Sequence, residues 1–300
     1  MSTGKLWHNI FWVWLLIIIC TCDIYGQDSP VVQYITDKVV VTTLAGSDIA
    51  GNKDGIGSEA QFDKPNGGYY DKNGFVWVAD IDQDRVAKIS SLGAVTSSQG
   101  GLIKKPIGLC VDAEGFVYVA STNNYILKMR SDGSQITVIA GNTNGVGGHK
   151  NGSALDALFS FPNDMVNDSL GNLFFTEFYN HTIRKLTPDG QVSIWVGNGM
   201  SGYQDGERSQ ALLSQPAGIA IDREDNLYIT EWSGHRIRKI NTLGQVSTLA
   251  GGTNTSLNAG YSDGKGTDAR FNTPDGIAVD LAGNIFIAES GTHCIRRIFS

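Results

Sequence analysis

One segment recurs five times along the chain, and this repeat constrains the fold more than any other feature. Each copy starts at a proline and holds three short apolar segments separated by turn residues. The copies read PNGGYYDKNGFVWVADIDQDRVAKI from Pro65, PIGLCVDAEGFVYVASTNNYILKM from Pro106, PNDMVNDSLGNLFFTEFYNHTIRKL from Pro162, PAGIAIDREDNLYITEWSGHRIRKI from Pro216 and PDGIAVDLAGNIFIAESGTHCIRRI from Pro274. Each copy therefore predicts three short antiparallel strands.

A fourth β-like segment accompanies the copies. These segments are VTTLAG at Val41, AVTSSQ at Ala94, ITVIAG at Ile136, VSIWVG at Val192 and VSTLAG at Val246. Four short strands per repeat are typical of the blades of a β-propeller, and the 37 glycines fit its many tight turns. Residues 40–45 precede the first complete blade, and the chain ends at Ser300, after the third strand of the last copy. We therefore expect this N-terminal strand to complete the last blade and close a five-bladed ring.

The copies resemble the NHL-repeat family, with its phrases P-x-G-I-A-V-D, G-N-(I/L)-Y-(I/V)-A-(D/E), N-x-R-I-R-K-I and V-T-T-L-A-G. The resemblance covers roughly residues 40–300. It implies a propeller, commonly six-bladed, that serves mostly as a binding platform. The alternative to a closed five-bladed ring is therefore a fragment of a six-bladed propeller.

The N-terminal residues have the pattern of a signal peptide. Lys5 and His8 precede the apolar segment IFWVWLLIIIC at residues 10–20, which is shorter than the ~20 residues of a spanning helix. We expect a signal peptide at residues 1–26, a short linker at 27–38, the propeller at 39–300, and a secreted protein. The alternative is an N-terminal membrane anchor with the propeller facing outside the cell.

Two further patterns concern covalent chemistry. Cys110 and Cys294 lie within apolar strand-like segments, which favours two buried free thiols over a disulfide. If the chain is secreted by a eukaryote, its glycosylation sequons predict a glycoprotein. The sequons lie at Asn151, Asn167, Asn180 and Asn254.

The longest loops connect each outermost strand to the next innermost strand, and they share a face with the turns between second and third strands. Four of the five loops carry Asp-Gly or Asn-Gly, then Ala five and Phe or Leu three residues before the proline. We expect one short helical turn in each, whose apolar residues fill the gap between blades. These residues are Ala60, Ala157, Ala211 and Ala269 with Phe62, Phe159, Leu213 and Phe271. The loop before Pro106 lacks the pattern, so the second blade is the irregular one.

Histidines, carboxylates and arginines also recur in fixed columns of the repeat. The histidines are His181, His235 and His293, the carboxylates Asp80, Glu177, Glu231 and Glu289, and the arginines Arg184, Arg238 and Arg296. Such groups could ligate a metal or act in acid–base catalysis. A catalytic group is normally needed once, however, so recurrence from blade to blade favours structural ion pairs and turn caps. We therefore predict no catalytic residues, no metal site and no cofactor.

Aromatic residues at loop tips are the best candidates for a binding surface. With one histidine, the predicted binding residues are Phe178, Tyr179, Trp232, His235, Tyr203 and Tyr261. The alternative is that these aromatic rings pack between blades. The net charge of −7 opposes nucleic-acid binding, and we expect no membrane contact after signal cleavage.

The predicted function is a secreted, non-catalytic interaction module that presents the loops of one propeller face to a protein or glycan partner. The alternative is a metal-dependent extracellular enzyme, resembling lactonases or peptide-amidating lyases, with its site in the central channel. Among the residues expected at the start of the innermost strands, only Asn66, Asn163, Asp164 and Asp275 are polar, which is a small set for a metal site.

Overall fold

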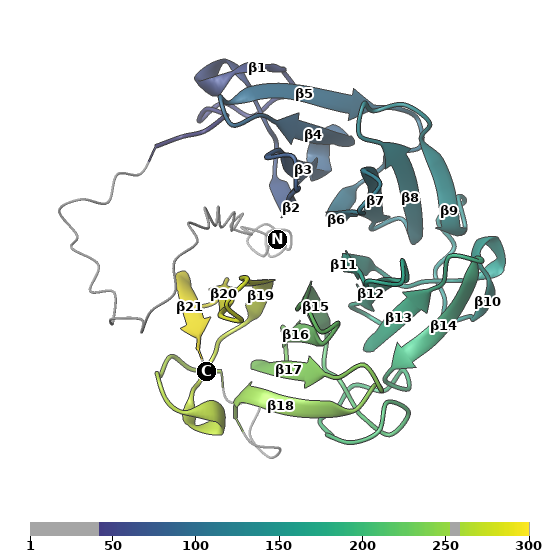
Figure 1. The fold of residues 1–300 in the computed structure, drawn as a ribbon, viewed down its shortest axis with the longest axis vertical. Coiled ribbons are helices and arrows are strands. Elements are labelled where there is room, and N and C mark those ends of the chain that lie inside the picture. Colours follow the sequence, from purple (N-terminus) through teal and green to yellow (C-terminus); the bar gives the residue numbers. More distant parts are fainter. Residues whose placement is uncertain (1–41, 253–258, 300) are drawn as a thin grey trace, which may run out of the picture.

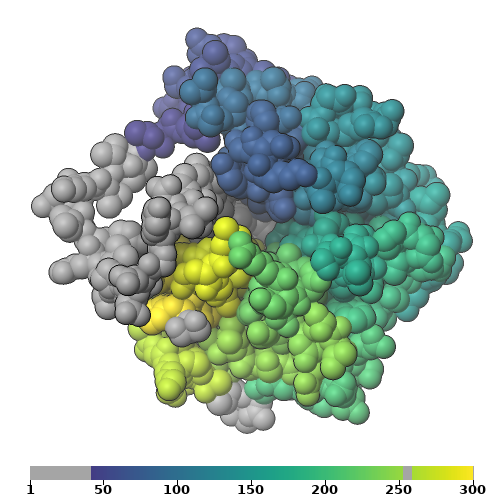
Figure 2. Space-filling model, in the orientation of Figure 1, coloured from purple at the N-terminus to yellow at the C-terminus, as the bar shows by residue number. Residues whose placement is uncertain are grey.

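The computed structural model describes residues 42–252 and 259–299 of the chain. They form five antiparallel sheets around a common centre, which confirms the predicted all-β propeller with five blades (Figure 1). In the space-filling view the blades pack side by side in sequence order, from purple to yellow (Figure 2). Within the described ranges, no helix is long and apolar enough to cross a bilayer. The predicted signal peptide and linker lie outside these ranges.

The blades are named first to fifth in chain order, and each runs from its innermost to its outermost strand. The first is β2 (Pro65–Tyr70), β3 (Val76–Asp80), β4 (Arg85–Ile89) and β5 (Ala94–Gln99); the second is β6 (Pro106–Val111), β7 (Phe116–Ser121), β8 (Tyr125–Arg130) and β9 (Thr137–Gly141). The third is β11 (Pro162–Asn167), β12 (Leu173–Glu177), β13 (Thr182–Leu186) and β14 (Gln191–Val196); the fourth is β15 (Pro216–Ile221), β16 (Leu227–Glu231), β17 (Arg236–Ile240) and β18 (Val246–Gly251). The fifth is β19 (Pro274–Val279), β20 (Ile285–Glu289) and β21 (Cys294–Ile298).

Short elements complete the loops. Two-residue strands β1 (Gly55–Ile56) and β10 (Gly152–Ser153) pair with the outermost strands β5 and β14. The 3₁₀ turns are η2 (Gly57–Glu59), η3 (Ile81–Gln83), η4 (Ala154–Asp156) and η5 (Gly266–Asp268).

Each innermost strand bulges directly after its proline, so that neighbouring blades approach closely near the centre. The pairing register shifts there in all five blades. A Cβ atom on Gly108 would lie 2.2 Å from the carbonyl oxygen of Asn163, and one on Gly218 would lie 2.3 Å from that of Asp275. Glycine is required at these two positions because a side chain would collide with the backbone of the next blade.

The hydrophobic core lies between the blades. The cluster between the second and third blades includes Ile126, Phe159 and Phe175, and the two phenylalanine rings meet edge to face at 5.0 Å. A cluster between the third and fourth blades includes Ile183 and Ile229, both completely buried. Alternation along each strand places one row of apolar side chains against each neighbouring blade, so every blade needs a neighbour to bury its faces.

The predicted helical turn is present in three of the four loops, as η2, η4 and η5. The patterned alanine is buried in all four loops, and so are Phe159, Leu213 and Phe271. Phe62 is half-buried. These side chains therefore fill the gaps between blades as expected. Cys110 and Cys294 are both free thiols, but Cys294 is only half-buried.

The predicted closing strand is not formed within the described residues. Residues 42–45 have no strand structure, and the fifth blade has three strands. Leu44 and Ala45 instead pack against the cluster of the first blade, and the Gly46 N–H donates to the Gly57 carbonyl at 3.0 Å. Gly197, directly after β14, makes the equivalent bond to the loop of the fourth blade. The segment is therefore held against the first blade in the way that an outermost strand contacts the blade that follows it.

Candidate functional site

The turns between second and third strands and the ends of the long loops lie on one face, which we call the loop face. On this face the residue after each second strand donates its backbone N–H to the carbonyl of the residue directly before the proline that starts the same blade. These bonds run from Ile81 to Lys64, Thr122 to Lys105, Phe178 to Phe161, Trp232 to Gln215 and Ser290 to Thr273. The five turns are therefore equivalent in backbone geometry, and they differ in the side chains that they present.

The carboxylate and arginine columns form buried ion pairs in the third, fourth and fifth blades. The arginine-to-carboxylate distances are 2.9 Å for Arg184–Glu177, 2.7 Å for Arg238–Glu231 and 2.7 Å for Arg296–Glu289. The carboxylates also accept backbone N–H groups of the long loops, from Ser160, Ser214 and Asn272. Each pair thus ties a strand end to its loop, which is a structural role.

The first blade forms its ion pair from a different arginine. Ala87 occupies the arginine column there, and Arg85 binds Asp80 at 2.8 Å and Asp54 at 3.2 Å instead. Residues 85 and 87 lie on the same face of β4, so either position can carry the guanidinium. The columns read from the sequence include Asp80. They miss Arg85, because Arg85 lies two residues before the expected arginine column.

The histidine column is explained by backbone conformation. His181, His235 and His293 have φ angles of 54, 52 and 58°, and the equivalent Asp84 and Asn124 have 50 and 69°. This left-handed region favours Asn, Asp and His among residues with a side chain. The histidines therefore close tight turns, in keeping with the interpretation of the column as a repeat element.

Four of these five turn residues also bind the next blade through their side chains. His181 Nδ1 accepts the backbone N–H of Gln215 at 3.0 Å, and His235 Nδ1 accepts that of Thr273 at 3.1 Å. Asn124 Oδ1 accepts the N–H of Phe161 at 2.9 Å, and Asp84 Oδ1 accepts the N–H of Lys105 at 2.8 Å. We call these four bonds the blade staples.

Burial lowers the pKa of His181 below its ordinary value. Burial also lowers the pKa of His235, and the neighbouring Arg236 guanidinium lowers it further. Both imidazoles therefore favour the neutral form, in which Nδ1 can accept the staple hydrogen bond.

An aromatic cluster lies on the loop face over the third and fourth blades. It consists of Phe161, Phe178, Tyr179 and Trp232. Phe178 lies 5.3 Å from Tyr179 and 6.0 Å from Trp232 between ring centroids, and Phe161 lies 5.2 Å from Tyr179. Tyr179 is 56% exposed, whereas the other three rings are half-buried. The structure thus brings together three of the predicted aromatic residues and adds Phe161, whose position directly before Pro162 could have signalled its proximity to the turns.

The other two predicted aromatic residues serve the ion pairs. Tyr203 lies 4.0 Å from the Arg236 guanidinium, and its hydroxyl accepts a hydrogen bond from Thr248. Tyr261 lies 5.1 Å from the Arg296 guanidinium. These rings cover buried arginines through cation–π contacts. No aromatic contact joins them to the cluster within the described residues.

The sequons differ in how their amides are used. The Asn180 amide donates to the Gly148 carbonyl at 2.8 Å and to Glu177 at 3.0 Å, and the Asn167 amide donates to Cys110 at 3.2 Å. Asn151 is exposed, and its oxygen accepts a bond from Arg184 at 2.9 Å. Asn254 lies outside the described residues. Asn151 is therefore the described sequon whose geometry best accommodates a glycan.

Two aspartates occupy the starts of innermost strands, near the centre of the ring. Burial raises the pKa of Asp164 to about 7 and that of Asp275 to about 6, and the nearby Asp275 carboxylate contributes to the raised pKa of Asp164. Asp164 accepts backbone N–H groups from Ile219 at 3.0 Å and Met165 at 2.9 Å. Within residues 42–252 and 259–299, no three His, Cys, Asp or Glu side chains are grouped to hold a metal ion.

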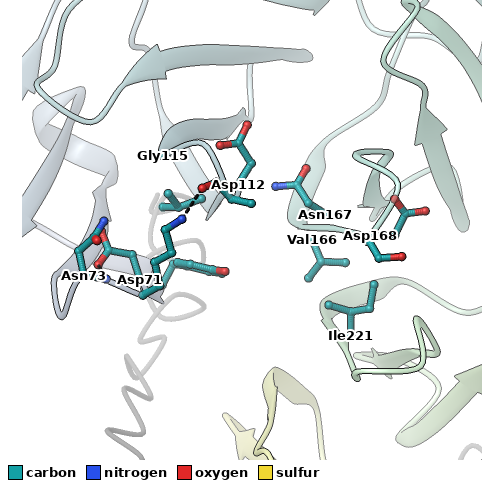
Figure 3. Close-up of a pocket in the computed structure, with 13 residues that line it drawn as sticks. Asp71, Asn73, Asp112, Gly115, Val166, Asn167, Asp168 and Ile221 are labelled. Atoms are coloured by element: carbon teal, nitrogen blue, oxygen red, sulfur yellow. Dashed lines mark hydrogen bonds between the residues drawn. The ribbon is translucent and has the colours of Figure 1, made fainter.

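A cavity of about 340 Å³ opens on the face that carries the turns between first and second strands, opposite the loop face. Asp71 and Asn73 lie on one side of it and Asn167 and Asp168 on the other (Figure 3). Its aspartates already hold the turns: Asp71 accepts the Trp77 indole N–H at 2.8 Å, and Asp168 accepts the Asn172 amide at 2.7 Å. The sequence identifies these residues as turns but does not predict the cavity between them.

No family model matches the chain. Curated relatives cover most of it. Protein SUPPRESSOR OF QUENCHING 1, chloroplastic, of Arabidopsis thaliana is 26% identical over 86% of this chain and 27% of its own length. NHL repeat-containing protein 2 of Homo sapiens is 24% identical over 82% of this chain and 40% of its own length. The chain thus spans less than half of either relative.

Solved structures share the fold. A protein of unknown function from Bacteroides thetaiotaomicron superposes with a TM-score of 0.56 at 24% identity, covering 85% of this chain and 74% of that one. The nidogen/laminin complex gives 0.58 at 17% identity, covering 79% and 76%. Virginiamycin B lyase from Staphylococcus aureus with quinupristin gives 0.55 at 20%, covering 79% and 67%. These likenesses show the propeller fold, and the five repeat copies together with the relative that is named for this repeat support an NHL-repeat family for the chain.

Proposed function

We propose that this chain is a secreted, non-catalytic binding module that presents its loop face to a protein or glycan partner. The aromatic cluster of Phe161, Phe178, Tyr179 and Trp232 is the observation that carries the proposal. These aromatic side chains are not part of the repeat, because the residue after the second strand is Ile81, Thr122 or Ser290 in the other blades. Large aromatic side chains near the centre of a surface are typical anchors of protein interfaces.

The scaffold beneath the cluster is rigid. The turn with Phe178 is held by the buried Glu177–Arg184 pair, and the turn with Trp232 by Glu231–Arg238. A partner would therefore meet side chains that are already ordered, which lowers the entropic cost of binding. The structural likeness to a propeller of the nidogen/laminin complex is in keeping with a protein partner.

The secreted state rests on the signal-peptide pattern of residues 1–26 and on an exposed sequon at Asn151. Expression in a eukaryotic host tests it. We expect the chain in the medium, with a glycan whose mass disappears in the Asn151→Gln variant. Retention inside the cell, or a chain bound to membranes through residues 10–20, would contradict secretion.

The binding proposal is tested by exposing the purified protein to arrays of extracellular proteins and of glycans. The test variant is Tyr179→Ala with Trp232→Ala, and the matched control is Leu243→Ala, an apolar side chain that is 78% exposed on a turn of the opposite face. We expect a ligand that the wild type and the control retain and the aromatic variant loses. A ligand that binds all three proteins equally would place the binding surface elsewhere.

A second candidate is an enzyme with its site in the central channel. It is favoured by the raised pKa values of Asp164 and Asp275, because perturbed carboxyl groups gather at catalytic sites, and by the likeness to a lyase. The test is turnover of lactones and cyclic depsipeptides with added divalent metal ions. Activity lost in Asp164→Asn and Asp275→Asn, with the fold intact by circular dichroism, would favour the enzyme over the binding module.

A further inference from the structure

The blade staples use side chains of different acid–base behaviour, although the four bonds are equivalent. Asn124 supplies an amide oxygen, which does not titrate, between the second and third blades. His181 and His235 supply imidazole nitrogens between the third and fourth and between the fourth and fifth blades. A protonated Nδ1 carries its own hydrogen and cannot accept one. The backbone N–H of the staple would then point at another N–H, and the hydrogen bond would be lost.

The two histidine staples lie directly at the aromatic cluster. His181 ends the turn that presents Phe178 and Tyr179, and His235 ends the turn that presents Trp232. The staple from His181 also fixes Gln215, whose carbonyl accepts the N–H of Trp232. Loss of that one bond would thus remove a restraint that both turns of the cluster share.

The charged groups around the imidazoles are engaged elsewhere. Below His181, Glu177 pairs with Arg184, and on the neighbouring blade the Glu231 carboxylate accepts the Ser214 N–H. Next to His235, Arg236 and Arg238 bind Glu231. On the fifth blade, Glu289 pairs with Arg296 and accepts the Asn272 N–H. Gly197, directly after β14, and Gly251, at the end of β18, lie against the carbonyls of His181 and His235.

We propose that the loop face is pH-gated: it keeps its binding conformation while His181 and His235 are neutral and loosens when they are protonated in mildly acidic surroundings. The proposal rests on the loop face being the binding surface, and it adds release of the partner on acidification. The face would then bind at extracellular pH and let go in an acidic compartment.

The direction follows from linkage. Because the pKa of each histidine is lowered in the folded state, the folded protein binds fewer protons than the unfolded chain. The staple contribution is therefore fully present above the ordinary histidine pKa of about 6.5 and is lost as the pH falls through the lowered folded-state value.

The test is amide hydrogen exchange at about pH 7.5 and about pH 5, corrected for intrinsic exchange rates, without any partner. We expect the protection of the Gln215 and Thr273 amides to fall by about tenfold at the lower pH, the order expected when one hydrogen bond is lost. The Phe161 amide is the internal control, because its acceptor Asn124 does not titrate. Equal behaviour of all three amides would overturn the proposal.

Variants separate the histidines from general acid effects. The double variant His181→Asn with His235→Asn has the non-titrating amide acceptor that Asn124 supplies in the second blade. The Gln215 and Thr273 amides should therefore stay protected from exchange at about pH 5. His293→Asn is the matched control, because no staple from His293 is present among the described residues, and it should keep the wild-type response. A response that survives in the double variant would contradict the assignment.

The same samples report on the aromatic cluster through Trp232. The ¹⁹F signal of 5-fluorotryptophan at Trp232, assigned with Trp232→Phe, should shift between the two pH values in the wild type and stay constant in the double asparagine variant. If the amides and Trp232 respond to pH but the arrays yield no ligand, the pH-dependent change is supported and the binding function is contradicted. If a ligand binds but the amides do not respond, binding stands and the gate fails.

Discussion

The second and fourth blades hold the same turn with opposite chemistry. In the fourth blade, Glu231 and Arg238 are fully buried and paired at 2.7 Å, and Arg238 reaches Asp205 at 2.7 Å. In the second blade, the equivalent positions are Ser121 and Leu127. There the Ser121 hydroxyl donates to the Lys104 carbonyl at 2.5 Å, and Tyr125 donates to the Leu102 carbonyl at 2.8 Å.

Neutral hydrogen bonds therefore replace a buried ionic network without changing the blade. The backbone bond from the turn to the long loop is the same in both, from Thr122 to Lys105 and from Trp232 to Gln215. The comparison teaches that the carboxylate–arginine columns are one of several ways to anchor a loop. Conversely, the aromatic residues of the third and fourth blades are not needed for the fold, since the second blade has Thr122 in their place.

The largest effect should come from breaking the fourth-blade network on one side. Arg238→Leu leaves Glu231 buried without its 2.7 Å partner, so we expect a loss of about 3–5 kcal/mol in the free energy of unfolding. Denaturant titration by circular dichroism measures it. Leu243→Ala, at a side chain that is 78% exposed, is the control and should change little. A loss below about 1 kcal/mol would mean that the pair is dispensable.

Replacing the Glu231–Arg238 pair by the residues of the second blade should restore much of the lost free energy of unfolding. Glu231→Ser with Arg238→Leu removes both charges of the 2.7 Å pair and leaves Arg236, which lies 3.6 Å from Glu231, as the remaining charge of the network. Replacing a buried pair is far less costly than breaking it. We expect the double variant to be more stable than Arg238→Leu alone, with a coupling energy of about 1–3 kcal/mol in a double-mutant cycle. Additive losses in the same denaturant titrations would show that the two blades are not interchangeable.

A smaller effect should come from a single staple. His181→Ala removes the acceptor for Gln215 and should cost about 1 kcal/mol more than His293→Ala at neutral pH. Both positions have positive φ, at 54 and 58°, so the strain of alanine cancels in the comparison. Thermal or denaturant unfolding at about pH 7.5 checks it. Equal losses would mean that the staple contributes nothing beyond the turn.

The smallest effect concerns Asn151, where the first and fourth blades have aspartate. Asp54 and Asp205 use their second oxygen to accept the N–H of Ser97 at 2.9 Å and of Thr248 at 3.0 Å. Asn151→Asp should restore an acceptor of this kind and stabilise the unglycosylated protein by up to about 1 kcal/mol, because the position is exposed. Destabilisation in the same unfolding assay would contradict the equivalence of the loops.

Much of the fold could be predicted from the repeat, because each blade is a local unit. One copy of the repeat contains its strands, its turns and the apolar residues that fill the gap to the next blade. The number of blades and the starts of the innermost strands at Pro65, Pro106, Pro162, Pro216 and Pro274 follow from it. The state of residues 42–45, the described part of the predicted closing strand, did not follow from it, because pairing with β21 depends on how the first and last blades meet. The described part of that segment instead packs on the first blade.

The candidate site was predictable only in part. Phe178, Tyr179 and Trp232 stand out because they interrupt a column, whereas Phe161 joins them through a turn that only the folded backbone brings close. Tyr203 and Tyr261 look alike in sequence but lie over arginines. The staples were missed because each joins side chain and backbone of two different blades, 34 residues apart for His181 and Gln215.

The most direct test of this account is the hydrogen-exchange footprint of the ligand identified on the arrays. Binding through the loop face predicts protection of residues 178–181 and 232–235 and no change around the opposite cavity near Asp71 and Asp168. Protection centred on that cavity, or on Asp164 and Asp275 in the channel, would contradict it and would move the function of this propeller away from its aromatic cluster.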